Sequence, residues 1–518
     1  MTPQRPMTSS SLFPKLKDAR RRSSIIGQDY LPVSSLDNLI TKETVEKELP
    51  RSLINRILPD SLPSKILKNA RRLFATLVMI GDPSAIRKLV GDGLTDDDLP
   101  FARPTRDHHG GILETKGRLE VRSFQDWNNE AKVDMFLEKQ WDFLAPILDV
   151  SGTSAVFQVD SKCPLPFLRA APLRGEHSNI VYKSELHAAH QTGSEVQNTD
   201  MVIALKVFHR SEGSELFEKE KENLLKTRGI EDRHLIRHLF FCERGQSYFI
   251  AFPWAEGGNL QEFWMLHTSN REYMLWSLQQ MLGLSGALRK LHDINFRHGD
   301  LKPGNILHFP HVGLGNLVVA DVGISKVHTA ATYERSISTF TRATTPSYEA
   351  PEATQKTNKP RPRRYDIWSM ACIYLEFVIW MIHGFSAINS FAESREDRTS
   401  IIPTSNFYAL RGDSAVIHPS VLDAFVALRG DPRCGDDTAL GAVINLITQH
   451  LLLVQVDDRV TADILYEKLE QIVRRATKDP SFIMNQATAP QETPAVFGRP
   501  VEIPAWLRKA TSWEQHEI

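Results

Sequence analysis

The stretch that decides the fold runs from residue 298 to residue 305 and reads HGDLKPGN. It places a carboxylate, an ammonium group and a carboxamide close together, on Asp300, Lys302 and Asn305. Two other stretches supply charged groups in suggestive settings. Lys206 lies inside the strand-like run MVIALKVF, and Asp321 directly follows the apolar run LVVA. Together these three stretches indicate a site that handles phosphate groups.

The chemistry that fits these residues is phosphoryl transfer from ATP. Such transfer depends on positioning and charge neutralisation more than on covalent chemistry by the protein. Metal ions must hold the phosphates, a cation must anchor them, and a carboxylate must orient the acceptor hydroxyl. The side-chain oxygens of Asn305 and Asp321 are hard donors of the kind that Mg²⁺ prefers. ATP and Mg²⁺ are therefore the predicted cofactors.

Two further motifs extend this pattern toward the C-terminus. Residues 345–352 read TPSYEAPE, and residues 365–369 read YDIWS. With HGDLKPGN and the lysine strand, they make residues 141–475 resemble the eukaryotic protein kinases, and in particular a group of fungal kinase-domain proteins that share HGDxKPxNIL and FPWAxGxL. This resemblance implies an α+β, bilobal fold with a β-rich N-lobe, an α-helical C-lobe and a cleft between them.

The resemblance assigns catalytic roles by position. Asp300 would accept the proton of the substrate hydroxyl or orient that hydroxyl. Lys302 would neutralise the γ-phosphate. Asn305 and Asp321 would bind Mg²⁺. Thr345 would bond Asp300 and Lys302, as in serine/threonine kinases. His298 would support the loop rather than act as a base.

A second set of roles concerns the nucleotide. Lys206 would contact the α- and β-phosphates and pair with a glutamate of the next helix. Glu220 is the preferred partner because Leu224 follows one turn later to pack inward; Glu218 and Glu222 remain alternatives.

The adenine site is predicted at residues 252–255. Phe252 would close the pocket behind adenine, and Trp254 and Ala255 would form the hinge, with Ala255 offering both N–H and C=O. The intervening proline lacks an N–H, which is tolerated where only a carbonyl is needed. The expected glycine-rich loop is the poorest match, because only Gly175 remains and Glu176 would repel phosphate.

Three residues are predicted to stabilise the fold around the site. Glu352 would pair with Arg459, and Asp366 would hold the backbone of the catalytic loop. Gly299 replaces the arginine that usually precedes the catalytic aspartate. That replacement implies less dependence on phosphorylation of the activation segment.

Three functions follow from these observations. The first is an ATP-dependent serine/threonine protein kinase that acts on protein hydroxyl groups, because the charged set is complete. The second is a pseudokinase signalling scaffold, which the degraded glycine-rich loop favours. The third is a small-molecule phosphotransferase, since such enzymes also carry HGDxxxxN loops.

The remaining sequence suggests four segments. We expect a disordered arm at residues 1–42, a helical N-terminal extension at 43–120, a kinase domain at 141–475 and a tail at 476–518. Within the kinase domain, the N-lobe would span residues 141–255 and the C-lobe 256–475. In the extension, residues 66–78 carry one apolar stripe, and Asp82-Pro83 would begin the next helix.

Composition limits the partners and the compartment. The net charge is −1, which favours neither nucleic acid nor a membrane surface. The resemblance to protein kinases implies a protein substrate or signalling partner. Four widely spaced cysteines fit reduced thiols in the cytoplasm or nucleus. The apolar run at residues 370–382 is short and contains Glu376, so we expect a buried core helix there.

Overall fold

The structure is a computed structural model. It describes residues 11–50, 61–104, 112–117, 119–127, 129–176, 179–193, 198–209, 211–310, 313–321, 345–353, 362–397, 404–412, 414–483 and 494–498, with backbone alone at 126, 174–176, 179, 211, 212, 345 and 346. The chain divides into two compact units. The first contains Met1–Phe217 and His238–Trp254, and the second contains Glu218–Arg237 and Ala255–Ile518.

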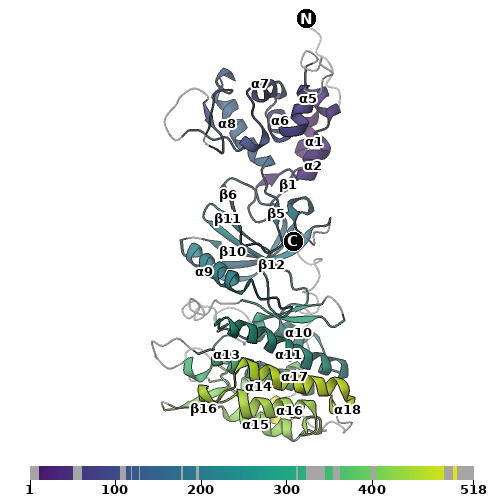
Figure 1. Ribbon diagram of the computed structural model, residues 1–518, viewed down its shortest axis with the longest axis vertical. Coiled ribbons are helices and arrows are strands. Elements are labelled where there is room, and N and C mark those ends of the chain that lie inside the picture. The colour runs from purple at the N-terminus through teal and green to yellow at the C-terminus, as the bar shows by residue number, and fades with distance from the viewer. Residues whose placement is uncertain are drawn as a thin grey trace. The chain divides into compact units, whose positions relative to one another are not determined.

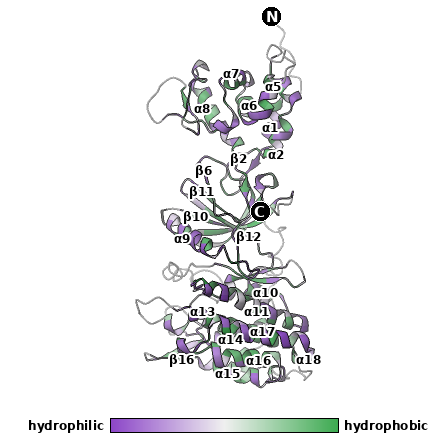
Figure 2. Cartoon of the chain, in the orientation of Figure 1, coloured by the Kyte–Doolittle hydropathy of each residue, from purple (hydrophilic) through white to green (hydrophobic). Residues whose placement is uncertain are grey.

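The first unit begins with a helical part built around one hydrophobic core (Figure 1). Its helices are α1 (Leu12–Asp18), α2 (Val33–Leu39), α3 (Lys42–Glu48), α5 (Leu62–Asn69), α6 (Arg71–Met79), α7 (Ile86–Gly91) and α8 (Glu130–Lys139). Two short strand pairs accompany them, β1 (Arg21–Arg22) with β2 (Asp29–Tyr30) and β3 (Leu113–Glu114) with β4 (Glu120–Val121). Figure 2 shows hydrophobic and hydrophilic residues sharing the ribbon of α8, as expected for a helix with one buried side.

The prediction of a disordered arm at residues 1–42 is wrong for residues 11–42, the part of this range that the structure describes. Residues 11–42 contain α1 and α2, and Leu12, Leu16 and Leu36 are buried in the same core as Phe143. Five buried apolar residues of this segment therefore pack in a core shared with residues much later in the chain, namely Leu12, Leu16, Leu31, Leu36 and Ile40. The helical part accordingly extends beyond the predicted range of 43–120 on both sides.

The apolar stripe at residues 66–78 is buried as predicted but belongs to two helices. Ala70 leaves helical geometry, with φ −142° and ψ 31°, and separates α5 from α6. After α6, Gly81 has φ +80°, a left-handed conformation that glycine adopts without a steric penalty. Pro83 then opens a short 3₁₀ turn that leads into α7.

Specific contacts join the helical part to the sheet of the same unit. The backbone N–H of Ser24 donates to the carbonyl of Phe167 at 3.0 Å. The N–H of Val33 donates to Nε2 of His190 at 3.2 Å, and Nδ1 of His190 lies 2.9 Å from the carbonyl oxygen of Pro146. Burial lowers the pKa of His190 to about 4, so its ring is neutral at pH 7 and fits this pair of partners.

The sheet of the first unit has six strands in the order β6-β11-β12-β10-β8-β7. They are β6 (Val156–Val159), β7 (Phe167–Glu176), β8 (Asn179–Leu186), β10 (Met201–His209), β11 (Phe240–Arg244) and β12 (Ser247–Pro253), beside a two-stranded pair β5 (Leu148–Asp149) and β9 (Gln191–Thr192). Within the six-stranded sheet all pairs are antiparallel except β6 with β11, and the separate pair β5 with β9 is also parallel. The strand predicted at residues 201–208 is thus confirmed by β10.

The second unit is mainly helical (Figure 1). Its helices are α10 (Leu260–Leu266), α11 (Arg271–Asp293), α13 (Arg364–His383), α14 (Phe385–Ser394), α15 (Pro419–Arg429), α16 (Ala439–Leu446), α17 (Ala462–Lys478) and α18 (Pro480–Ile483). Two hairpins complete it, β13 (Ile306–Phe309) with β14 (Asn316–Val319) and β15 (Tyr408–Arg411) with β16 (Ser414–Ile417). Helix α9 (Ser211–Thr227) begins in the first unit and ends in the second.

Helix α13 is the central helix of the second unit. By length and hydropathy it could cross a membrane, but the whole of its most apolar window is buried inside the protein. Neighbouring helices cover it, which is the arrangement predicted for residues 370–382.

The tail predicted from residue 476 also contacts the second unit where it is described. Phe497 is fully buried, with its ring stacked on His383 at a centroid distance of 4.5 Å.

Candidate active site

The stretch HGDLKPGN forms a loop between α11 and β13, and its three polar side chains meet. Nζ of Lys302 lies 2.9 Å from Oδ2 of Asp300. Nδ2 of Asn305 donates to the same Oδ2 at 2.9 Å and to the backbone carbonyl of Asp300 at 2.8 Å. Both side-chain contacts fall on one carboxylate oxygen, which fixes the rotation of the carboxylate. The structure therefore brings together three of the residues predicted to carry out the chemistry.

His298 holds the loop by using both ring nitrogens. Nε2 lies 2.9 Å from the carbonyl oxygen of Ala320, so it must carry the proton and donate. Nδ1 then accepts the backbone N–H of Asp300 at 3.3 Å. The ring is fully buried. A histidine engaged in this way supports the loop and has no free nitrogen to act as a base, in agreement with the sequence interpretation.

Asp366, in the first turn of α13, anchors the backbone of the loop. Its Oδ2 accepts the N–H of His298 at 2.9 Å, and its Oδ1 accepts the N–H of Gly299 at 2.8 Å. Nε2 of His292, at the end of α11, lies 3.0 Å from Oδ2. The predicted role of Asp366 is confirmed, while His292 was not anticipated because a histidine near a helix end carries no distinctive signal by itself.

The two predicted magnesium ligands are linked through the backbone. The N–H of Ala320 donates to the carbonyl of Asn305 at 2.8 Å, and Asp321 is the next residue. Asp321 is exposed and has φ +56°, a left-handed conformation that is unusual for a residue other than glycine. Such local strain often occurs at functional sites.

The donor chemistry of these two residues suits Mg²⁺. Because Nδ2 of Asn305 donates twice to Asp300, the amide oxygen is the acceptor end of that side chain. In the described part of the chain, no group of three or more histidine, cysteine, aspartate or glutamate side chains is placed to hold a metal. Mg²⁺ does not require such a cage, since it commonly uses one or two protein ligands together with substrate phosphates and water.

Lys206 lies in β10, one of the inner strands of the sheet, between β8 and β12. Ile203, Leu205 and Val207 alternate with it and belong to the hydrophobic core of the sheet. Side chains alternate between the two faces of a strand, so Lys206 lies on the opposite face from that core. Only 7% of Lys206 is exposed, which is rare for lysine and argues against a solvated edge charge.

Among the glutamates of α9, burial singles out Glu220. It is 6% exposed, whereas Glu218 and Glu222 are exposed to solvent and Glu218 pairs with Lys221 at 2.7 Å. Leu224 is buried one turn later, as the sequence predicted. The choice of Glu220 as the functional glutamate remains a prediction, and its burial favours it.

The residues predicted to bind adenine, 252–255, include the point in the sequence where the first unit ends, at Trp254, and the second resumes, at Ala255. Phe252 is half-buried in β12, and Nζ of Lys183 lies 4.8 Å from the ring centroid of Trp254. Ala255 is buried, and its carbonyl accepts the N–H of Gly258 at 3.1 Å. A carbonyl oxygen has two lone pairs, so this turn leaves room for the predicted second acceptor role.

Some predicted residues fall partly or wholly outside the described residues. Gly175 lies in β7 opposite Ile180, and the side chains of its neighbours in the sequence are not described. Thr345 begins a 3₁₀ turn that ends at Tyr348, but its side chain is not described. The side chain of Glu176 and the residues that follow Asp321 lie outside the described residues as well. Their roles stay predictions.

The ion pair between Glu352 and Arg459 is confirmed. Both nitrogens at the tip of Arg459 bond the carboxylate, at 2.7 and 2.8 Å, in a bidentate arrangement. Nε of Arg459 donates to the carbonyl of Leu453 at 2.7 Å. The arginine is 1% exposed, so these partners are needed to offset its desolvation.

A second buried ion pair in the same unit was not predicted. Glu376 in α13 accepts the hydroxyl of Tyr348 at 2.6 Å and lies 3.5 Å from Nη2 of Arg395. The signal for it was present, because an ionised side chain inside an otherwise apolar helix needs a partner. No sequence pattern identifies Arg395 as that partner, and this residue lies directly after α14.

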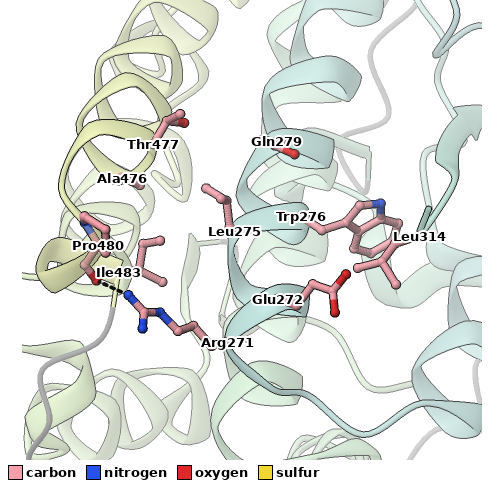
Figure 3. A pocket seen from close by; sticks show the side chains of 10 residues that line it. All are labelled: Arg271, Glu272, Leu275, Trp276, Gln279, Leu314, Ala476, Thr477, Pro480 and Ile483. Atoms are coloured by element: carbon pink, nitrogen blue, oxygen red, sulfur yellow. Dashed lines mark hydrogen bonds between the residues drawn. The ribbon is translucent and has the colours of Figure 1, made fainter. Parts of the chain in front are cut away.

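A pocket of about 610 Å³ lies elsewhere in the second unit. Leu275 of α11 points toward Ala476 of α17 and Pro480 and Ile483 of α18, whereas Trp276 lies on the other side of α11 beside Leu314 (Figure 3). None of the residues around this pocket belongs to the predicted catalytic set. It is therefore distinct from the candidate active site.

Comparison with known proteins identifies the family. The family model described as "Protein kinase domain" matches residues 193–463, which is just over half of the chain. The chain therefore belongs to the protein kinase family. The predicted α+β protein kinase fold is confirmed by this match and by the mixed sheet and helices described above.

Individual relatives are similar over about a third of the chain. The calcium/calmodulin-dependent protein kinase type I of Schizosaccharomyces pombe is 27% identical over 177 residues, covering 34% of this chain and 51% of that protein. The serine/threonine-protein kinase H1 homolog of Pinctada fucata is 27% identical over 177 residues, 34% and 40% of the two chains. The serine/threonine-protein kinase ATG1a of Arabidopsis thaliana is 26% identical over 200 residues, 36% and 30%. The chain thus spans about half or less of these curated relatives.

Proposed function

We propose that this protein is an ATP- and Mg²⁺-dependent serine/threonine protein kinase. The observation that carries the proposal is the joined set of Asp300, Lys302 and Asn305 on a loop whose backbone is anchored by Asp366. Names of the relatives that include serine/threonine-protein kinase support the choice of acceptor.

The proposed reaction assigns one task to each group. Asp300 orients the acceptor hydroxyl and receives its proton as the bond from the hydroxyl oxygen to the γ-phosphorus forms. The bond from that phosphorus to the β–γ bridging oxygen breaks, and ADP leaves. Lys302 offsets negative charge on the transferred group, and buried Lys206 does so for the phosphates that remain on the nucleotide. When Mg²⁺ is bound, it neutralises phosphate charge; Asn305 and Asp321 would supply its protein ligands.

The test is transfer of the γ-phosphate of labelled ATP to a generic protein acceptor such as casein or myelin basic protein. Asp300→Asn should lower kcat by about 10²- to 10⁴-fold, the usual contribution of a positioned acid or base. Asp293→Asn is the matched control, because Asp293 is an exposed aspartate at the end of α11. Equal activity of the wild type and Asp300→Asn would refute the proposal.

A pseudokinase scaffold is the second candidate, since residues 174–179 retain only Gly175 where glycines normally let backbone N–H groups approach phosphate. Thermal melting with and without Mg-ATP distinguishes the kinase from the pseudokinase scaffold. A ligand at 100 times its Kd stabilises the folded state by about 2.7 kcal/mol. No shift at millimolar Mg-ATP would favour the scaffold, and phosphate found only on small hydroxyl compounds would favour a small-molecule phosphotransferase.

A further inference from the structure

Residues 345–353 are fastened to α13 through Tyr348. Its hydroxyl donates to Glu376 at 2.6 Å, and its backbone carbonyl accepts the hydroxyl of Ser369 at 2.8 Å. Glu376 and Ser369 both belong to α13, the helix that also anchors the catalytic loop through Asp366. One buried helix therefore sets the position of this segment relative to Asp300.

Glu376 is a buried carboxylate and needs a positive partner. Its side chain is 2% exposed, and Nη2 of Arg395 lies 3.5 Å from the carboxylate oxygen that Tyr348 does not use. Arg395 is itself only 1% exposed. Burial raises the pKa of Glu376, and Arg395 is the main influence that opposes this rise. Without Arg395, the carboxylate would have no counter-charge in this arrangement.

Arg395 is held by aromatic rings rather than by a full set of hydrogen bonds. Its guanidinium carbon lies 3.7 Å from the ring centroid of Phe391 and 3.8 Å from that of Phe407. Nε donates to the carbonyl of Ser405 at 3.3 Å, and Nη1 is buried without a hydrogen-bond partner. A planar guanidinium can stack in this way, whereas an ammonium group cannot.

The contacts close into a ring of four side chains. Phe407 stacks on Arg395 and also packs against Tyr348, with ring centroids 5.9 Å apart. Tyr348, Glu376, Arg395 and Phe407 thus each touch two others, and we call this set the Tyr348 cluster. Helices α13 and α14, which flank it, pack against each other (Figure 1). A change in any member is therefore felt at Tyr348.

We propose that Arg395 is a positioning residue for phosphoryl transfer. It acts through Glu376 and Phe407 to fix Tyr348, and thereby fixes residues 345–353 relative to Asp300. This inference rests on the proposed kinase function. Because the cluster anchors this segment on the same helix that anchors the loop of Asp300, its loss should impair the use of the protein acceptor and leave the KM for ATP unchanged.

The first test measures position without requiring activity. Amide hydrogen exchange of the peptide that contains residues 345–353 is compared in the wild type, Arg395→Met and Arg395→Lys. Both variants should exchange faster in this peptide, with Arg395→Lys less affected because it keeps a charge. Arg433→Met is the matched control, since Arg433 pairs with Asp431 at 2.6 Å in the same unit and lies outside the cluster.

The second test measures the reaction with separate titrations of ATP and protein acceptor. Arg395→Lys should raise the acceptor KM on the order of tenfold, in the middle of the range of coupling between contacting side chains. The KM for ATP should stay within twofold of the wild-type value, as should both constants in Arg433→Met. Lys is used here because it also keeps the test open if Arg395→Met fails to fold.

The outcomes distinguish this inference from the proposed function. Unchanged exchange at residues 345–353 in a folded Arg395 variant overturns the positioning role, whether or not the protein is active. Equal rises in the two KM values, or effects equal to those of Arg433→Met, also overturn it. An inactive wild type whose exchange responds to Arg395→Lys refutes the kinase proposal and the catalytic part of the inference, but supports the structural link between Arg395 and the segment.

Discussion

Two buried carboxylates of α13 do similar work by different means. Asp366 holds the catalytic loop by accepting two backbone N–H groups, at 2.9 and 2.8 Å. Glu376 holds residues 345–353 by accepting from the side chains of Tyr348 and Arg395, at 2.6 and 3.5 Å. Backbone donors are present whatever the side chain, so the loop tolerates glycine at position 299. The second anchor depends on the identity of each partner.

The largest effect should follow from breaking the Asp366 anchor. Asp366→Asn keeps one acceptor oxygen but sets an NH₂ group against a buried backbone N–H. We expect a loss of about 3 kcal/mol in unfolding free energy, the upper range for an unsatisfied buried donor. Urea denaturation measures it. Asp457→Asn is the control, because Asp457 is almost fully exposed; an equal loss in both variants would contradict the anchor role.

The pH dependence of Glu376→Gln should sharpen the contrast between the two anchors. Burial raises the folded-state pKa of Glu376 above its ordinary value of 4.5. Glu376 therefore binds its proton more tightly in the folded protein than in the unfolded chain, and this stabilises the folded state. The stabilisation is complete below pH 4.5 and is lost as the pH rises through the folded-state pKa.

The wild type should thus lose stability relative to Glu376→Gln as the pH rises. Thermal melting between pH 5 and pH 8 measures the melting temperature of the wild type minus that of Glu376→Gln. This difference should be larger at pH 5 than at pH 8. Glu470→Gln, a change at a helix surface, should show no such trend. A Glu376→Gln effect that grows with pH would show that the carboxylate is stabilised in its ionised form instead.

The smallest effect concerns the backbone of the catalytic loop. Gly299 has φ +80°, where an added side chain costs about 1 kcal/mol or slightly more. Gly299→Ala should lower the unfolding free energy by this amount. Gly304→Ala, five residues later, should be neutral, because nothing lies within 4 Å of its added carbon and its φ is not positive. Chemical denaturation of both variants measures the change in unfolding free energy that each substitution causes.

Much of the fold was predictable because local patterns agree with tertiary burial. The apolar run at residues 201–208 forms an inner strand of the sheet, and the apolar run at residues 370–382 lies in a helix that is buried on all sides. Asp300, Lys302, Asn305, Asp366 and Arg459 could be chosen because they lie in distinctive short motifs. Each of these residues contacts a partner that lies close to it in the sequence or in a second distinctive motif.

The failures have a common physical cause, which is long-range contact without a local pattern. Leu12 and Leu16 look like isolated apolar residues in a Ser-rich segment, yet they pack into the same core as Phe143. Arg395 is one arginine among many in the sequence, and only the folding of α13 and α14 places it beside Glu376. Ala70 interrupts a continuous apolar stripe because two short helices, rather than one, cover that core.

The sheet of the first unit has a practical consequence for anyone who shortens this chain. The family match begins at residue 193, whereas strands β7 and β8 end before it, at Glu176 and Leu186. A fragment cut to the match would lose both strands and leave β10, with Lys206, as a bare edge open to pairing with other chains. Such a fragment would aggregate, and its inactivity would say nothing about the catalytic power of the full chain.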